Sequence, residues 1–393
     1  MKLLLEDGTE LAGSPFGAAA EPRRPDGEGT PSARVGPALP ARDPLRPVGG
    51  EVVFNTAMTG YVEALTDPSY RGQILVLTYP LVGSYGVPPP REAGTLATPY
   101  ESDRIQVQGL VVQSYVSGHS HHAATRALGD WLASEGVPGM TWVDTRTLTR
   151  KLRESGTMMG YLVPQGVDTA SLASTARVVD MHEEVFRLVA PRYPIRYPGG
   201  PLEVLLVDAG AKDNLVRSLL ARGASVVRAP WHANLAELAA SADGILIGNG
   251  PGDPKDLGAL VEKVRALYGA YRGPIFGVCL GNQIMALAAG GDTYKLPYGH
   301  RGVNQPVQDL LTRRCFVTSQ NHGYAVREGS LPPEWEPWFV NLNDGSNEGV
   351  RSRLRPFSSV QFHPEASPGP RDTEFLFDDF LRLVGAMASA KAV

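Results

Sequence analysis

Residues 274–291 read PIFGVCLGNQIMALAAGG, and this stretch decides the fold of the second half of the chain. An apolar strand comes first, Cys279 stands between two glycines, and an apolar helix is predicted over 282–290. The pattern G-x-C-x-G has the spacing of a nucleophile elbow, in which the flanking glycines let a strand turn sharply into a helix. We therefore predict that Cys279 projects above the sheet at a helix N-terminus, where N–H groups and the helix dipole favour a thiolate. The alternative is a buried structural cysteine. Cys315 lies on a probable strand without flanking glycines, and we interpret it as structural.

Around this elbow, unbroken apolar runs alternate with helical segments. Strands are predicted at 201–210, 225–230 and 243–254, and helices at 213–223 and 257–273. Continuous apolar strands that alternate with helices are typical of a parallel sheet covered on both faces. We predict an α/β domain over 202–393 with a mostly parallel sheet, and its site at the carboxyl ends of the strands.

The N-terminal half has a different pattern. Strands are predicted at 51–58, 73–80 and 105–116, and helices near 124–136 and 145–156. This mixture indicates an α+β domain over 1–155, followed by a connecting segment over 156–201. Residues 18–50 contain seven prolines, five glycines, five arginines and no aromatic residue. Such a composition buries too little apolar surface to offset its ordering entropy, so we predict a disordered insertion there.

Composition excludes several classes of function. The chain has 393 residues, 37 Lys plus Arg against 41 Asp plus Glu, and a formal charge of −4, which argues against nucleic-acid binding. No apolar run approaches the roughly 18 residues of a membrane span, and the N-terminal run is too short for a signal peptide. With two cysteines the chain can form neither a disulfide framework nor a cysteine zinc cluster. We therefore expect a cytoplasmic location, and we expect no metal site. Neither G-x-x-x-x-G-K-[ST] nor G-x-G-x-x-G occurs, which favours acyl chemistry over ATP or NAD chemistry.

A base for Cys279 is predicted near the end of the chain. His363 follows a strand pattern, and Glu365 lies two residues further on, so in extended geometry the two side chains face the same side. Cys, His and Glu in this order form a plausible catalytic triad, with a purely structural His–Glu pair as the alternative. Backbone N–H groups of Leu280 and Gly250 are candidates for an oxyanion hole.

Several motifs carry a family resemblance. GVCLGNQ (277–283), ILIGNGPGDP (245–254), TSQNHGYAV (318–326) and VQFHPEASPGP (360–370) resemble the triad-type, class I glutamine amidotransferases. In the N-terminal half, FNTAMTGYVEALTDPSY (54–70), LTYPLVGSYG (77–86) and VDTRTLTRKLRESG (143–156) are similar to the small, glutamine-hydrolysing subunits of carbamoyl phosphate synthetases. The resemblance covers nearly the whole chain except 18–50.

The resemblance implies a mechanism and a set of site residues. Cys279 would attack the side-chain amide of L-glutamine, His363 would transfer protons, and Glu365 would orient His363. Residues that match glutamine-binding or oxyanion positions are Ala57, Gly250, Gly252, Leu280, Gln283, Asn321, Gly323 and Tyr324. The ammonia would pass to a large subunit that uses ATP and Mg²⁺, so this chain would need no cofactor. The product, carbamoyl phosphate, serves pyrimidine and arginine biosynthesis.

Two residues depart from the family pattern. Ala57 replaces a serine that contacts substrate in some members, and Asn282 replaces the usual histidine. Neither departure affects the triad, so we expect activity. Two alternatives remain open: the glutaminase of another amidotransferase, such as one serving anthranilate or guanylate synthesis, and a catalytically silent regulatory scaffold. The N-terminal domain argues against the first, and the intact triad argues against the second.

Overall fold

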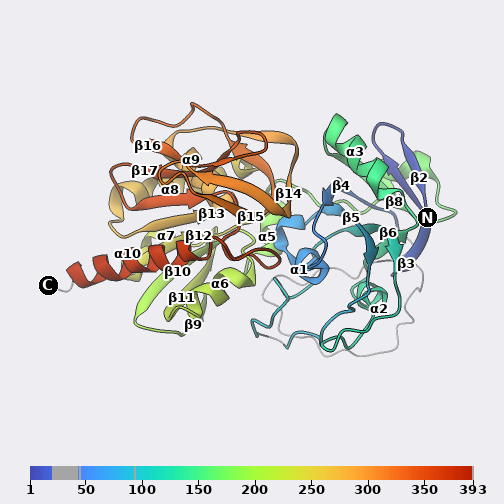
Figure 1. Cartoon of the computed structure of the whole chain (residues 1–393), viewed down its shortest axis with the longest axis horizontal. Helices are drawn as coiled ribbons and strands as arrows, with labels where there is room; N and C mark the ends of the chain where they lie inside the picture. The colour runs from blue at the N-terminus through green and yellow to red at the C-terminus, as the bar shows by residue number, and fades with distance from the viewer. Residues whose placement is uncertain (20–42, 44–45, 93, 392–393) are drawn as a thin grey trace. The chain divides into compact units, whose positions relative to one another are not determined.

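The computed structural model describes residues 1–19, 43, 46–92 and 94–391 (Figure 1). It divides into two compact units, and among the described residues the first ends at Met181 and the second begins at His182. This boundary lies inside the predicted connecting segment, 156–201, and strands at both ends of that segment belong to the sheets of the two units. Most of the predicted insertion lies outside the described residues. Its last residues, 48–50, are not disordered, since they open a buried strand.

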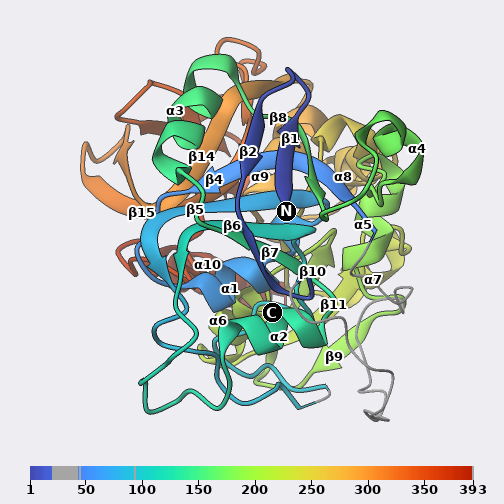
Figure 2. The same ribbon diagram turned by 90° about the vertical axis from the view of Figure 1, so that its right-hand side faces the viewer.

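The first unit is built on an eight-stranded sheet in the order β2-β1-β8-β4-β5-β6-β7-β3, whose strands are seen in Figure 2. The strands are β1 (Lys2–Leu5), β2 (Glu10–Ala12), β3 (Ser14–Gly17), β4 (Val48–Asn55), β5 (Gln73–Val82), β6 (Gly109–Tyr115), β7 (Pro138–Thr141) and β8 (Met158–Val163). The helices are α1 (Tyr61–Thr66), η1 (Pro68–Tyr70), α2 (Leu128–Ser134), α3 (Thr145–Ser155), η2 (Thr169–Ser171) and α4 (Leu172–Thr175). Strands β4 to β7 are parallel and the other pairings are antiparallel, so this α+β unit has a parallel centre.

Helix α3 shows how local sequence sets an element. Asp144 caps its start by accepting a hydrogen bond from the N–H of Thr147 at 2.9 Å. Leu148 and Leu152 lie one turn apart and are buried, so one stripe of the helix packs inward. The helix ends at Ser155, and Gly156, the residue after it, has a φ of 89° that suits glycine.

The second unit is built on a ten-stranded sheet in the order β15-β14-β16-β17-β18-β13-β12-β10-β11-β9. Its strands are β9 (Ile195–Tyr197), β10 (Leu202–Asp208), β11 (Ala224–Pro230), β12 (Gly244–Ile247), β13 (Ile275–Val278), β14 (Thr293–Asp309), β15 (Cys315–Val326), β16 (Trp335–Asn341), β17 (Asn347–Ser352) and β18 (Phe357–Val360). Its helices are α5 (Glu183–Val189), α6 (Asp213–Leu220), α7 (Leu235–Ser241), η3 (Pro254–Leu257), α8 (Gly258–Ala270), α9 (Leu280–Ala289) and α10 (Phe375–Lys391).

The predicted parallel sheet is confirmed at the centre of this unit. Strands β18, β13, β12, β10 and β11 are mutually parallel, and β14 to β17 extend the sheet with antiparallel pairings that the sequence did not predict. Among the described helices, none has the length and apolar character needed to cross a membrane.

Helices cover both faces of the central strand β13. A Cβ on Gly277 would lie 2.7 Å from Sδ of Met285, so α9 packs on that face. The neighbouring residue Phe276 points to the opposite face, where its ring contacts Phe377 and Phe380 of α10 at centroid distances of 6.3 and 5.7 Å. The alternation of a strand therefore separates the two helix layers.

A buried ion network shapes the loop that follows β10. Arg228 of β11 donates hydrogen bonds to Asp208 and Asp213, and all three side chains are at most 3 % exposed. Asp208 also accepts hydrogen bonds from the N–H groups of Gly210 and Ala211, at 2.6 and 2.7 Å. The network holds the backbone of 209–212 at the carboxyl end of β10.

We predict that Arg228→Leu lowers the free energy of unfolding of this unit by roughly 3–5 kcal/mol, because it leaves two buried carboxylates without their cation. Urea unfolding of the variant and of wild type measures the loss. Arg187→Leu is the control, because Arg187 forms an exposed pair with Glu183 that contributes little. A loss below about 1 kcal/mol for Arg228→Leu would contradict the importance of the network.

Candidate functional site

The predicted elbow is present, with Cys279 between β13 and α9. Cys279 has φ 55° and ψ −105°, a strained conformation for a residue with a side chain. Its N–H donates to the carbonyl of Val360 at 2.9 Å, and its carbonyl accepts from the N–H of Asn282 at 3.0 Å. Helix α9 begins at Leu280, two residues before the predicted start, so Cys279 directly precedes its first turn.

The two flanking glycines are required by close backbone contacts. A Cβ on Gly281 would lie 2.1 Å from the carbonyl oxygen of Ile247, and a Cβ on Gly277 would lie 2.8 Å from the backbone of Gly281. Any larger residue at either position would force the strand and the helix apart. The prediction that glycine closes this turn is confirmed.

His363 and Glu365 meet as predicted. Nδ1 of His363 lies 2.6 Å from Oε1 of Glu365, and both side chains are almost completely buried. The N–H of His363 donates to the carbonyl of Ser319 in β15 at 2.9 Å, which fixes the backbone beside the sheet. Nε2 of His363 has no hydrogen-bond partner in the described part of the chain. The imidazole therefore keeps one nitrogen for Glu365 and has the other available for chemistry.

The charges around His363 favour an imidazolium. Burial alone would lower its pKa, but Glu365 and then Cys279 outweigh burial, and the pKa of His363 is raised. Cys279 is thus close enough to affect the imidazole, although no thiol–imidazole hydrogen bond is closed in this structure. Burial would raise the pKa of Glu365, but Lys212 and His363 together lower it.

Lys212 belongs to the site and was not predicted. Its Nζ lies 3.3 Å from Oε1 of Glu365, is buried, and also donates to the carbonyl of Ala366. Its backbone N–H donates to Oδ1 of Asn249 at 2.9 Å. The available signal was its position, since Lys212 directly follows the loop at the carboxyl end of a buried strand, where sites of parallel sheets lie.

Gly250 and Leu280, whose N–H groups are the two predicted oxyanion donors, are neighbours in space. A Cβ on Gly250 would approach Cδ2 of Leu280 to 2.8 Å and the carbonyl of Ala209 to 2.4 Å, so the loop after β12 closes tightly on the elbow. Within the described residues, the N–H groups of Gly250 and Leu280 donate to no backbone carbonyl. Gly252, in the same loop, has a φ of 80°. That the two N–H groups serve one oxyanion stays a prediction.

Strand β15 brings three further predicted residues to the elbow. Sγ of Cys279 lies 3.8 Å from the carbonyl oxygen of Asn321. Nε2 of Gln283 donates to the carbonyl of Tyr324 at 2.8 Å and to Oε1 of Gln361 at 3.1 Å. Gly323 lies between these two β15 residues. The contacts of these three residues with substrate stay predictions. So does that of Gln283, whose amide nitrogen is hydrogen-bonded within the protein.

Asn282 has a structural role here. Its Nδ2 donates to Oε1 of Gln361 at 3.2 Å, and its Oδ1 accepts from Oγ of Ser359 at 2.9 Å. The residue is completely buried. Its amide therefore joins the start of α9 to β18 and to Gln361, the residue that follows this strand, through two neutral hydrogen bonds.

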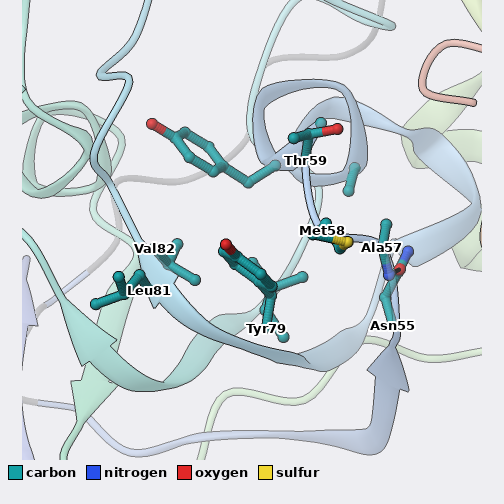
Figure 3. Close-up of a pocket in the computed structure, with 11 residues that line it drawn as sticks. Asn55, Ala57, Met58, Thr59, Tyr79, Leu81 and Val82 are labelled. Carbon is teal, nitrogen blue, oxygen red and sulfur yellow. Dashed lines mark hydrogen bonds between the residues drawn. The ribbon is translucent and has the colours of Figure 1, made fainter. Parts of the chain in front are cut away.

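Ala57 is the one predicted site residue that lies in the first unit. It is buried, and its N–H donates to Oδ1 of Asn55 at 2.7 Å. Figure 3 shows it in a small pocket of that unit, among side chains that include Met58 and Tyr79. The other predicted site residues all belong to the second unit.

Both halves of the chain match known families. Residues 205–383 match Glutamine amidotransferase class-I, and residues 36–162 match the Carbamoyl-phosphate synthase small chain, CPSase domain. A carbamoyl phosphate synthase small chain of Symbiobacterium thermophilum is 47 % identical over 98 % of both chains. An arginine-specific small chain of Schizosaccharomyces pombe is 45 % identical over 86 % of this chain and 82 % of its own. The multifunctional protein pyrABCN of Emericella nidulans is 41 % identical over all of this chain, which spans 17 % of its length.

We predict that Glu365→Gln makes His363 lose its proton at lower pH than in wild type. Burial lowers the pKa of His363, and a neutral amide cannot offset this effect as the carboxylate does. The pKa of His363 should therefore fall in the variant. NMR of chains labelled with ¹⁵N-histidine measures the titration, and His363→Asn identifies the signal. Glu183→Gln, at an exposed ion pair, is the control and should leave the titration unchanged. The same titration in Glu365→Gln and wild type would refute this assignment of charge.

Proposed function

The chain belongs to the carbamoyl phosphate synthase small chain family, and on this premise we propose that it hydrolyses glutamine at Cys279 and supplies the ammonia for carbamoyl phosphate synthesis. The observation that carries the proposal is a buried His363–Glu365 pair beside a cysteine on a strained strand-to-helix turn. Carbamoyl phosphate made with this ammonia would serve pyrimidine and arginine biosynthesis.

The first half of the reaction forms a covalent intermediate. The thiol proton of Cys279 passes to His363, and Sγ bonds to the carbon of the glutamine side-chain amide. The carbonyl oxygen becomes an oxyanion, to which the N–H groups of Leu280 and Gly250 would donate hydrogen bonds. His363 then gives its proton to the amide nitrogen, the carbon–nitrogen bond breaks, and ammonia leaves a γ-glutamyl thioester.

The second half regenerates the thiol. His363 takes a proton from a water molecule, whose oxygen attacks the thioester carbon through a second oxyanion. The carbon–sulfur bond breaks, Sγ of Cys279 recovers its proton from His363, and glutamate leaves. Glu365 stabilises the imidazolium at both stages, and Lys212 keeps Glu365 ionised within the buried site.

We further propose that the ammonia is delivered to a large subunit that holds ATP and Mg²⁺, and that the pair works in the cytoplasm. Support for a separate partner comes from the length relations: the chain spans almost all of a small chain but a minor part of a multifunctional protein. The chain itself would then bind glutamine and need no cofactor.

Cys279→Ser and His363→Asn should each lower glutamine-dependent carbamoyl phosphate synthesis by at least roughly 10³-fold in the reconstituted complex. A serine hydroxyl is not ionised near neutral pH, and asparagine cannot carry the proton. Synthesis from added ammonium should continue at the wild-type rate, because that reaction does not use this site.

Cys315→Ser is the matched control, since Cys315 is the exposed second cysteine, and it should behave as wild type. Glutamine-dependent synthesis that survives Cys279→Ser would refute the nucleophile. Loss of the ammonium-dependent reaction in the same variant would assign the cysteine to assembly of the complex.

A further inference from the structure

Four buried or half-buried titratable side chains form a second cluster in the antiparallel part of the second unit. His300 of β14 and His322 of β15 are direct partners across the two strands, and their rings meet edge to face at 4.9 Å. Glu348 of β17 and Asp344, in the turn before it, complete the cluster. The proposed mechanism uses none of these four residues.

His300 lies between two carboxylates. Its Nε2 is 2.8 Å from Oδ2 of Asp344, and its Nδ1 is 3.3 Å from Oε1 of Glu348, which also accepts from Asn341 at 2.9 Å. Nδ1 also lies 3.4 Å from Nδ2 of Asn341, and the two carboxylates beside the ring favour its protonated form, the imidazolium. Burial lowers the pKa of His300, but Glu348 and Asp344 outweigh burial and raise it.

His322 is neutral for the complementary reason. Burial and the charge of His300 lower its pKa well below the ordinary value, and Arg301 acts in the same direction. Its Nδ1 lies 2.8 Å from the carbonyl oxygen of Tyr324, which can only accept, so Nδ1 carries the proton. Its Nε2 lies 3.1 Å from Oε1 of Gln320, so contacts at both nitrogens fix the orientation of the ring.

The segment 321–324 connects this cluster to the nucleophile. The carbonyl of Tyr324 that accepts from His322 also accepts from Gln283 of α9, at 2.8 Å. On the other side of His322, the carbonyl of Asn321 lies 3.8 Å from Sγ of Cys279. A shift of the His322 ring would thus move the backbone on both sides of it relative to the elbow.

We propose that His300 is a positioning residue for glutamine hydrolysis: held between Asp344 and Glu348, it fixes His322 and, through it, the 321–324 segment against the elbow. This inference rests on the proposed function. It predicts an effect on glutamine binding, because the segment carries residues expected to hold the substrate while the triad comes from other elements.

The test compares His300→Asn with wild type in the complex with the large subunit. We expect the KM for glutamine to rise roughly tenfold, as for loss of hydrogen bonds to a charged group, with kcat within about twofold of wild type. Asp344→Asn changes the half-exposed partner of His300 and should also raise the KM for glutamine. It replaces His300→Asn as the test variant if His300→Asn does not fold. His182→Asn is the matched control, because His182 pairs with Asp256 at an exposed site of the same unit.

Two further readouts separate positioning from mere stability. NMR with ¹⁵N-histidine should show both ring nitrogens of His300 protonated at neutral pH, and synthesis from ammonium should stay unchanged in every variant. A KM equal to that of wild type in His300→Asn and Asp344→Asn, or a fall in kcat alone, would overturn the proposal. Metal analysis gives a further test. One equivalent of bound divalent metal in wild type that is lost in His300→Asn would also overturn the proposal, because a metal at Nδ1 of His300 would replace the proton.

A wild-type complex that does not hydrolyse glutamine would refute the proposed function, and the positioning role with it. Hydrolysis by wild type with an unaltered KM in both variants would refute the positioning role alone.

Discussion

The backbone of Cys279 is held at a positive φ, which costs a residue with a side chain about 1–3 kcal/mol. The surrounding contacts fix it there. Its N–H donates a hydrogen bond to β18, its carbonyl accepts one from the first turn of α9, and Gly281 packs directly on the backbone of β12. These contacts belong to three parallel strands that neighbour one another. The central sheet therefore supplies the constraint that aims the sulfur, and the other site groups are placed relative to it.

Electrostatics makes this position reactive. Lys212, Glu365 and His363 form a buried chain of alternating charge, in which Lys212 and His363 stabilise the carboxylate of Glu365 and Glu365 stabilises the imidazolium of His363. Removing such charges from water is costly, and close contacts together with hydrogen bonds compensate the cost. Lys212 is placed by a loop that the buried ion pairs of Arg228 hold. The electrostatics of the triad thus depends on residues far from it in the chain.

Much of this could be predicted from the sequence. The apolar runs that became β10 to β13, and the two glycines around Cys279, predicted the parallel centre and the elbow because both depend on local patterns. His363 and Glu365 could be paired because they lie two residues apart. Lys212 and the His300 cluster could not, because the partners of Lys212 and His300 lie in other segments, at least 22 residues away along the chain, and no period connects them. The antiparallel pairings of β14 to β17 were missed for a similar reason, as these strands mix polar and apolar residues with less regular alternation. Residues 48–50 were assigned to an insertion on composition, although they pair in a sheet.

The most direct test of the account is to trap the covalent intermediate. The wild-type chain, mixed with glutamine and quenched in acid within one turnover, is digested and its peptides are weighed by mass spectrometry. We predict a γ-glutamyl group on the peptide that contains Cys279 and an unmodified peptide around Cys315. Glutamate production with no adduct on Cys279, or with an adduct on another residue, would contradict the account.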